Sequence, residues 1–213
     1  MVARTHERLR EASVRVRVTG ADPVGPASAP TAGLRVRELR WSDFDDLRES
    51  YYLLYEERQA GYPIGITLFA ERPSYADEAA WFSTTYQKVL AGDMIASVAE
   101  LDGHAVGNCM VGRVGPSASS ESGHMGLLGI VVHRDYRGRG IGSALLRDAL
   151  RQCRGKFEAV RLSVFSVNKG ARRLYERFGF VLVGHLPRVV RRGTEYFDED
   201  LMLLDLTRPE ANR

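Results

Sequence analysis

The sequence predicts an α/β (α+β) fold with one mixed central sheet and helices on both faces of it. A continuous apolar run at 127–132, rich in β-branched residues, is typical of a strand covered on both sides. An amphipathic helical pattern follows at 141–153, and Asp102-Gly103 between two apolar runs is a strong hairpin signal. The chain of 213 residues is long enough for one compact domain with a sizeable core.

Composition divides the chain into an N-terminal extension (1–33), a domain (34–207) and a C-terminal tail (208–213). Residues 1–18 carry five arginines against two glutamates, and 20–33 form a Gly/Ala/Pro/Ser tract typical of a flexible segment. The extension lacks the continuous apolar segment of a secretory signal. An organellar presequence stays open beside a disordered tail or a mis-assigned start codon.

Charge and cysteine content narrow the class of protein. A formal net charge of +3 is too small by itself to indicate nucleic acid or a membrane as a partner, and no apolar run approaches the length of a membrane span. Cys109 and Cys153 form no C-x-x-C motif, so we expect no metal site. Both are predicted to be buried, reduced thiols of a cytoplasmic protein, and their apolar surroundings disfavour a catalytic cysteine.

In the first part of the domain, the sequence pattern predicts a strand, two helices and a loop. Alternating apolar and charged residues at 34–39 indicate a half-buried strand. Ser42 or Asp43 can cap the helix that follows, a loop-like stretch spans 59–73, and a second helix fits 75–91. The apolar positions of these helices are Leu47, Tyr51, Leu54 and Tyr55 on the first and Ala79, Phe82, Tyr86 and Leu90 on the second.

In the middle of the domain, the sequence predicts a hairpin and then the central strand. Strands at 93–101 and 105–111 form the hairpin, and a Ser/Gly-rich loop at 115–123 leads into the central strand. After the helix at 141–153, alternation predicts another strand at 159–164.

In the last part of the domain, the sequence predicts a helix and two final strands. The strands fit 180–183 and 196–206, with a basic connection at 187–193 between them. The predicted elements begin mainly with strands and continue as strand-helix-strand-helix-strand-strand. This order gives a mixed sheet with helices on both faces.

A glycine-rich turn at 137–142 joins the central strand to its helix. Three glycines in five residues remove the Cβ atoms that would keep a ligand away from the backbone, and free N–H groups of the helix start point out of the turn. This predicts a phosphate or pyrophosphate site, against the alternative of a tight turn without a ligand. A dinucleotide fingerprint is excluded because its last glycine would fall on Ser143 or Leu145, and no G-K-[ST] follows. The polar side of the helix is Ser143, Arg147, Asp148, Arg151 and Gln152.

Two motifs in this region resemble those of the GCN5-related N-acetyltransferase (GNAT) superfamily. Motif A of that family, [RQ]-x-x-G-x-[GA], is matched by Arg137, Gly140 and Gly142. Its motif B, N-x-x-A-x-x-L-Y-x-x-x-G-F, is matched by Asn168, Ala171, Leu174, Tyr175, Gly179 and Phe180. The resemblance covers roughly 34–206 and implies a mostly antiparallel sheet whose central strand splays from the next one at a bulge.

The resemblance also implies acetyl-CoA as co-substrate, with no metal. The pyrophosphate would be held by backbone N–H groups of the glycine turn, with added charge from two arginines. The residues of that turn are Arg137, Gly138, Arg139, Gly140, Ile141 and Gly142. Ile130, Val131 and Val132 would meet the coenzyme through their main chains, and one N–H would polarise the acetyl carbonyl. Asn168 is a helix N-cap by position, and in the family it also contacts the coenzyme.

Tyr175 is the predicted general acid. It lies seven residues after Asn168, which returns it to nearly the same helix face. A phenol with a pKa near 10 can protonate a departing thiolate whose conjugate acid has a pKa of about 8.5. The alternative is a core aromatic.

The general base is less clearly indicated. Many family members place a glutamate eleven residues before the motif A Arg or Gln, where this chain has Gly126. His124, two residues earlier and therefore on the same strand face, has a suitable pKa and could act through a water. Glu121 and Glu100 are weaker substitutes, and an amine that arrives neutral would need no dedicated base.

The end of the chain resembles the branch of the family that acetylates free amino acids and polyamines. That branch tends to end in G-x-Y-x-D-x-x-M, and Gly193, Tyr196, Asp198 and Met202 show it with one extra residue. We therefore expect a small-molecule amine acceptor, with no nucleic acid or membrane partner; a homodimer stays open. The alternatives are a protein N-terminal or lysine acetyltransferase, a catalytically silent CoA-binding regulatory module and a nucleotide- or phosphate-binding interaction domain.

Two further groups of residues are candidates for the acceptor side. Acidic residues near the chain end could attract a cationic amine or form a solvated face: Glu195, Asp198, Glu199 and Asp200. Aromatic residues could line the acceptor: Tyr62, Trp81 and Tyr86.

Overall fold

The structure, a computed structural model, describes residues 32–61 and 66–207. Most of the predicted extension, the predicted tail and Tyr62 lie outside these ranges. None of the described helices is long and apolar enough to cross a membrane.

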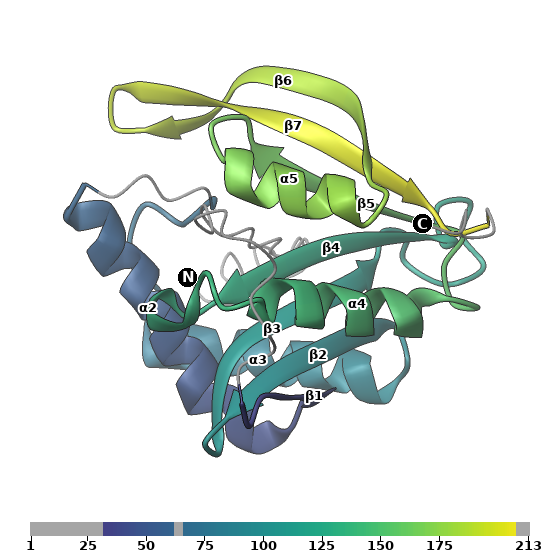
Figure 1. The fold of residues 1–213 in the computed structure, drawn as a ribbon, viewed down its shortest axis with the longest axis horizontal. Coiled ribbons are helices and arrows are strands. Elements are labelled where there is room, and N and C mark those ends of the chain that lie inside the picture. The colour runs from purple at the N-terminus through teal and green to yellow at the C-terminus, as the bar shows by residue number, and fades with distance from the viewer. Residues whose placement is uncertain (1–31, 62–65, 208–213) are drawn as a thin grey trace, which may run out of the picture.

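One sheet organises the described part of the chain (Figure 1). Its strands run in the order β1-β2-β3-β4-β5-β7-β6, and every neighbouring pair is antiparallel except β4 and β5. The mixed, mostly antiparallel sheet is therefore confirmed. The strand bounds are β1 Arg35–Glu38, β2 Met94–Leu101, β3 His104–Arg113, β4 Met125–Val132, β5 Ala159–Phe165, β6 Val181–Arg192 and β7 Glu195–Asp205.

Helices cover both faces of the sheet, as predicted (Figure 1). α4 and α5 pack over one face in the larger apolar cluster, and α2 and α3 pack over the other face. The bounds are η1 Trp41–Asp43, α2 Phe44–Gln59, α3 Tyr75–Leu90, η2 Arg134–Tyr136, α4 Ile141–Cys153 and α5 Lys169–Arg177.

The central strand β4 is buried on both sides. Leu128 and Ile130 belong to the cluster under α4, whereas Val131 packs with Tyr55 of α2. This confirms the prediction from its continuous apolar run.

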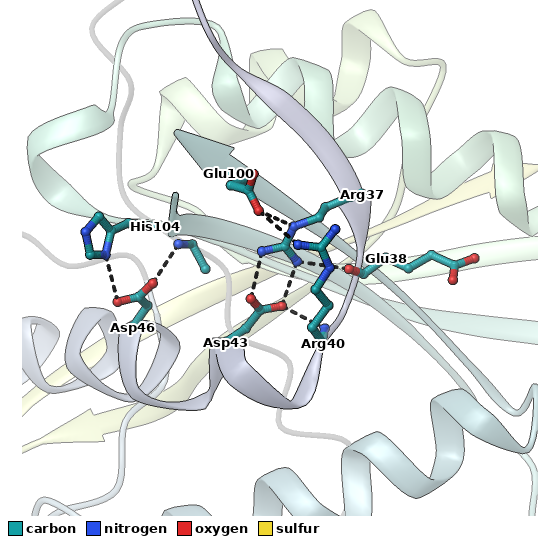
Figure 2. A network of polar contacts seen from close by, with 8 residues as sticks. Arg37, Glu38, Arg40, Asp43, Asp46, Glu100 and His104 are labelled. Atoms are coloured by element: carbon teal, nitrogen blue, oxygen red, sulfur yellow. Dashed lines mark hydrogen bonds and ion pairs between the residues drawn. The ribbon is translucent and has the colours of Figure 1, made fainter. Parts of the chain in front are cut away.

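A polar network fastens the start of α2 to the sheet (Figure 2). The buried Asp43 carboxylate accepts two hydrogen bonds of 2.8 Å from Arg37 of β1, and Arg37 also pairs with Glu100 of β2. Asp43 occupies the N-cap position of α2 but makes no side-chain cap there, so the predicted capping role is wrong. Its carboxylate instead accepts from the half-buried Arg37 and, at 2.7 Å, from the backbone N–H of Arg40, which precedes η1.

The hairpin signal is confirmed, and so is the second helix. Asp102 and Gly103 have φ of 52° and 84°, the left-handed pair that a tight two-residue turn needs. Ser74 caps α3 by accepting from Asp77 N–H. Leu90, predicted on the apolar side of that helix, is 72% exposed, and its neighbour Val89 packs against the apolar cluster instead.

β6 corrects the expectation of a basic connection at 187–193. The strand continues to Arg192, and the turn is Gly193-Thr194. The pairing with β7 is interrupted between Leu186 and Val190, where Arg188 has φ 56°. The proline in this stretch is tolerated because β6 is the edge strand and the proline lies in an irregular part of it.

Packing also corrects one polar residue of α4. Asp148, predicted on the solvent side, is buried and accepts a 2.7 Å hydrogen bond from Ser97 of β2. Cys109 and Cys153 are buried free thiols, as predicted. Burial raises the pKa of Cys153 to about 12 and that of Cys109 well above its ordinary value, so neither supplies a thiolate at neutral pH.

Candidate active site

The site begins where β4 and β5 separate. They pair only from Met125–Ala159 to Leu127–Arg161, whereas β5 stays paired with β7 along its whole length. Figure 1 shows the two strands parting toward their carboxyl ends. The register of β4 with β3 is continuous, so the expected bulge in β4 is absent from this pairing. The splay arises because β5 follows β7.

The separation exposes one main-chain edge of β4. Val114 donates its N–H to the Met125 carbonyl, so the main-chain groups of Met125 point toward β3. Because this direction alternates along a strand, the same holds for Leu127, Gly129 and Val131. The N–H and C=O groups of Ile130 and Val132 therefore lie on the edge facing the gap. Val131 turns toward β3 instead, which corrects its expected place beside them.

The glycine turn lies directly beyond this edge. Gly138 and Gly140 have φ of 75° and 79°, a conformation that L side chains rarely adopt. Gly140 is the N-cap of α4, and its carbonyl accepts the first helical hydrogen bond, from Ala144 N–H at 3.1 Å. The N–H groups of 141–143 precede that bond and have no acceptor inside the helix. This backbone arrangement fits the diphosphate of a coenzyme.

The two arginines of the turn differ from each other. Arg137 is held in a bidentate pair with Glu57 of α2, at 2.8 and 3.1 Å, and its Nε donates to the Val132 carbonyl. Its charge is therefore matched within the protein, which corrects the expectation that it adds charge for a phosphate. Arg139 is exposed, with its guanidinium over the Tyr136 ring at 5.3 Å.

Glu57 was not identified from the sequence. It is buried on α2 and eighty positions from Arg137, so no local pattern links the two. Through Arg137 and the Val132 carbonyl, Glu57 ties α2 both to the end of β4 and to the glycine turn.

Replacing Glu57 with glutamine is expected to lower the free energy of unfolding by about 1–3 kcal/mol, because a largely buried guanidinium loses its matching charge. Urea denaturation measures this. Glu56→Gln is the matched control: Glu56 is exposed and 3.8 Å from Arg134, so its loss should change stability by less than about 0.5 kcal/mol. Equal effects of the two variants would contradict a special role for the Glu57–Arg137 pair.

α5 carries the two polar residues of motif B. Asn168 is buried and caps the helix, its side-chain oxygen accepting from Ala171 N–H at 3.1 Å, so its cap role is confirmed. Its contact with the coenzyme stays a prediction. Tyr175 is fully buried, hydroxyl included, and packs edge-on against Phe180 with ring centroids 5.8 Å apart. The ring is thus part of the core, and its role as acid stays a prediction.

His124 is not brought to this site. It is exposed and precedes β4, whereas the glycine turn follows the other end of that strand. Eight residues at about 3.3 Å each place it about 26 Å along the strand from Val132. A Cβ at Gly126 would lie 2.6 Å from a methyl carbon of Val111 and 3.4 Å from the Phe157 ring, so that position faces the core. A carboxylate there would be buried among apolar groups.

The acidic residues of β7 have separate surroundings. Asp200 is buried and accepts from His185 and Arg172 at 2.8 and 2.9 Å. Burial favours a higher pKa for Asp200, but hydrogen bonds from His185 and Ser166 and the charge of Arg172 together hold that pKa below its ordinary value. Asp200 is therefore used within the fold and is not open to a cationic amine. Asp198 accepts from the backbone N–H of Arg188.

The aromatic residues expected on the acceptor side lie elsewhere. Trp81 and Tyr86 pack against the apolar cluster of α3 with β2. The ring centroids of Tyr86 and Trp41 are 5.4 Å apart. β2 is two strands away from β4, so neither ring borders the gap. Among the described residues, no group of three or more His, Cys, Asp or Glu side chains could hold a metal ion.

Comparisons with known proteins agree with this geometry. A family model described as "Acetyltransferase (GNAT) family" matches residues 30–180. The L-amino acid N-acetyltransferase AaaT of Escherichia coli (strain K12) is 29% identical over 103 residues, which are 47% of this chain and 62% of that protein. The chain thus spans about three fifths of the length of this curated relative.

Solved structures share the fold. yncA from Salmonella typhimurium, solved with acetyl-CoA, has a TM-score of 0.70 at 19% identity, covering 85% of this chain and 99% of that one. A phosphinothricin acetyltransferase (Pat) from Sinorhizobium meliloti, in complex with AcCoA, has a TM-score of 0.68 at 20% identity, covering 82% and 89%. At these identities the likeness concerns the fold alone.

Proposed function

Because the chain belongs to the acetyltransferase (GNAT) family, we propose that it transfers the acetyl group of acetyl-CoA to a primary amine by direct attack in a ternary complex. The observation that carries the proposal is the gap between β4 and β5, with a glycine turn and a free helix start at its end. Main-chain N–H groups can both polarise a thioester carbonyl and bind a diphosphate, and here N–H groups for the two tasks lie at the end of β4 and in the turn that follows it.

In this proposal each group of residues has one task. N–H groups of the turn and of the start of α4 bind the diphosphate, and Arg139 adds positive charge. Main-chain groups of Ile130 and Val132 orient the pantetheine and polarise the acetyl carbonyl. The amine nitrogen forms a bond to the carbonyl carbon, the C–S bond breaks, and Tyr175 gives its proton to the sulfur while the amine releases one to water or a base.

The acceptor in this proposal is a small molecule, an amino acid or a polyamine. The name of AaaT supports such an acceptor. A protein N-terminal or lysine acetyltransferase and a silent CoA-binding module are the alternatives. The two free, buried cysteines fit a cytoplasmic location.

Two measurements test the proposal in sequence. Acetyl-CoA should raise the melting temperature, because it binds the folded state. Thiol release should then occur with at least one member of a panel of amino acids, polyamines, aminoglycosides and short peptides. A thermal shift without thiol release from any acceptor would favour the silent module, and no shift at all would contradict the assigned coenzyme site.

A further inference from the structure

Two guanidinium groups on the α2 side of the sheet bind only carbonyl oxygens. Arg58 of α2 donates to the Phe69 and Ala70 carbonyls, at 3.0 Å each, and Arg192 of β6 donates to the Ile66 carbonyl. Within the described ranges, no carboxylate oxygen lies within 4.0 Å of either guanidinium. Two positive charges are thus held near one another without a matching anion at ion-pair distance.

Both cations are sheltered by aromatic rings. Arg192 lies 5.0 Å from the Phe165 ring centroid and 5.2 Å from that of Phe197, and Arg58 lies 4.9 Å from that of Tyr55. Burial, together with the charge of Arg58, holds the pKa of Arg192 below its ordinary value despite the opposing effect of Glu195. An anion bound between the two arginines would relieve this repulsion.

The pair lies beside the separated ends of β4 and β5. Phe165 is the last residue of β5, and Tyr55 packs against Val131 near the end of β4. Val131 and Tyr55 are on the face opposite α4, whose start carries the glycine turn. A coenzyme bound at the turn and an acceptor bound by the arginines would therefore approach the gap from opposite faces.

A carboxylate lies on the same face as the arginines. Glu199 of β7 is two residues from Phe197 and therefore shares its side of the sheet. Its Oε1 is 3.4 Å from the hydroxyl of Thr67, the residue after the Ile66 that binds Arg192. In the described part of the chain, no Lys, Arg or His nitrogen lies within 4.0 Å of the Glu199 carboxylate.

We propose that Arg58 and Arg192 bind the carboxylate of a free α-amino acid and that Glu199 binds its ammonium group. The inference rests on the proposed acetyltransferase function and names its acceptor class. A free α-amino acid carries both charges, on two groups bonded to the same carbon. A polyamine has no carboxylate, and the N-terminal residue of a protein has a neutral amide in its place.

Steady-state kinetics on the full chain test this with matched acceptors: several L-amino acids, each with its decarboxylated amine and its amide, and spermidine. The wild type should show a higher kcat/KM for at least one amino acid than for its amine and amide. Arg58→Gln and Arg192→Gln should each lower that ratio roughly 10- to 100-fold, the usual effect of losing a hydrogen bond between charged groups. Glu199→Gln should lower kcat/KM for amino acids and their amides alike.

Arg191→Gln is the matched control, because Arg191 is exposed and adjacent to Arg192 but points to the other side of β6; it should keep the ratio. The acetyl-CoA thermal shift shows that each variant is folded. Arg58→Gln changes α2 and Arg192→Gln changes β6, so the two variants test the proposed carboxylate site from two separate elements. An active wild type that prefers spermidine or the decarboxylated amines, or arginine variants that keep the ratio, would overturn this inference alone. A wild type inactive with every acceptor would overturn the proposed function and this inference together.

Discussion

Replacing Gly140 with alanine is expected to raise the Kd for acetyl-CoA roughly 10- to 100-fold, through weakened charge-assisted hydrogen bonds to the diphosphate. Gly140 is the N-cap of α4 at φ 79°, a conformation that alanine adopts only with strain, so the substitution should disturb the backbone whose N–H groups face the diphosphate. Calorimetric titration with acetyl-CoA measures the change.

Gly155→Ala separates strain from binding in this experiment. Gly155 follows the same helix at φ 81°, and a Cβ there meets no atom within 4 Å. Both substitutions should therefore lower the melting temperature by a similar amount, since a left-handed L residue costs about 1–2 kcal/mol. Only Gly140→Ala should weaken coenzyme binding. A similar Kd for the two variants would place the diphosphate elsewhere.

Tyr175→Phe is expected to lower kcat about 100-fold or more, the usual contribution of a positioned general acid. The Kd for acetyl-CoA should change little, because no proton transfer occurs on binding. The variant should stay folded, since phenylalanine keeps the edge contact with Phe180. Single-turnover thiol release at saturating acetyl-CoA measures the effect.

Tyr86→Phe is the control for loss of a phenol from a packed aromatic cluster. Tyr86 stacks on Phe82 on α3, away from the gap. The Tyr86→Phe variant should keep a kcat within about twofold of the wild-type value, because the change is remote from the reacting groups. If Tyr175→Phe behaved in the same way, Tyr175 would be a core aromatic only.

Much of the fold follows from local sequence, for local reasons. Asp102-Gly103 forms the predicted turn because few other residue pairs tolerate two positive φ angles in a row. α4 runs from Ile141 to Cys153 as its apolar spacing predicts, and Asn168 caps α5 through a bond to a residue three positions on. The glycine turn was predictable in the same way, since its conformation depends on missing side chains.

The features that the sequence did not predict depend on partners far along the chain. Arg137 has the same local sequence whether it is open to a phosphate or held by Glu57, and only the packing of α2 decides between the two. Strand periodicity assigns His124 a face but not a distance from the coenzyme site. In the structure that distance is large, because α4 starts beyond the opposite end of β4.

Local sequence specifies the helices α3, α4 and α5, the Asp102-Gly103 turn and the glycine backbone that suits a diphosphate, because each depends on residues close together along the chain. Which charges remain available to a ligand depends instead on contacts between distant segments. Asp200 and Arg137 are matched within the fold, whereas Arg58, Arg192 and Glu199 have no oppositely charged group within 4.0 Å in the described part of the chain. Whether a charge is matched depends on the three-dimensional approach of distant segments, and no periodicity along the chain records that approach.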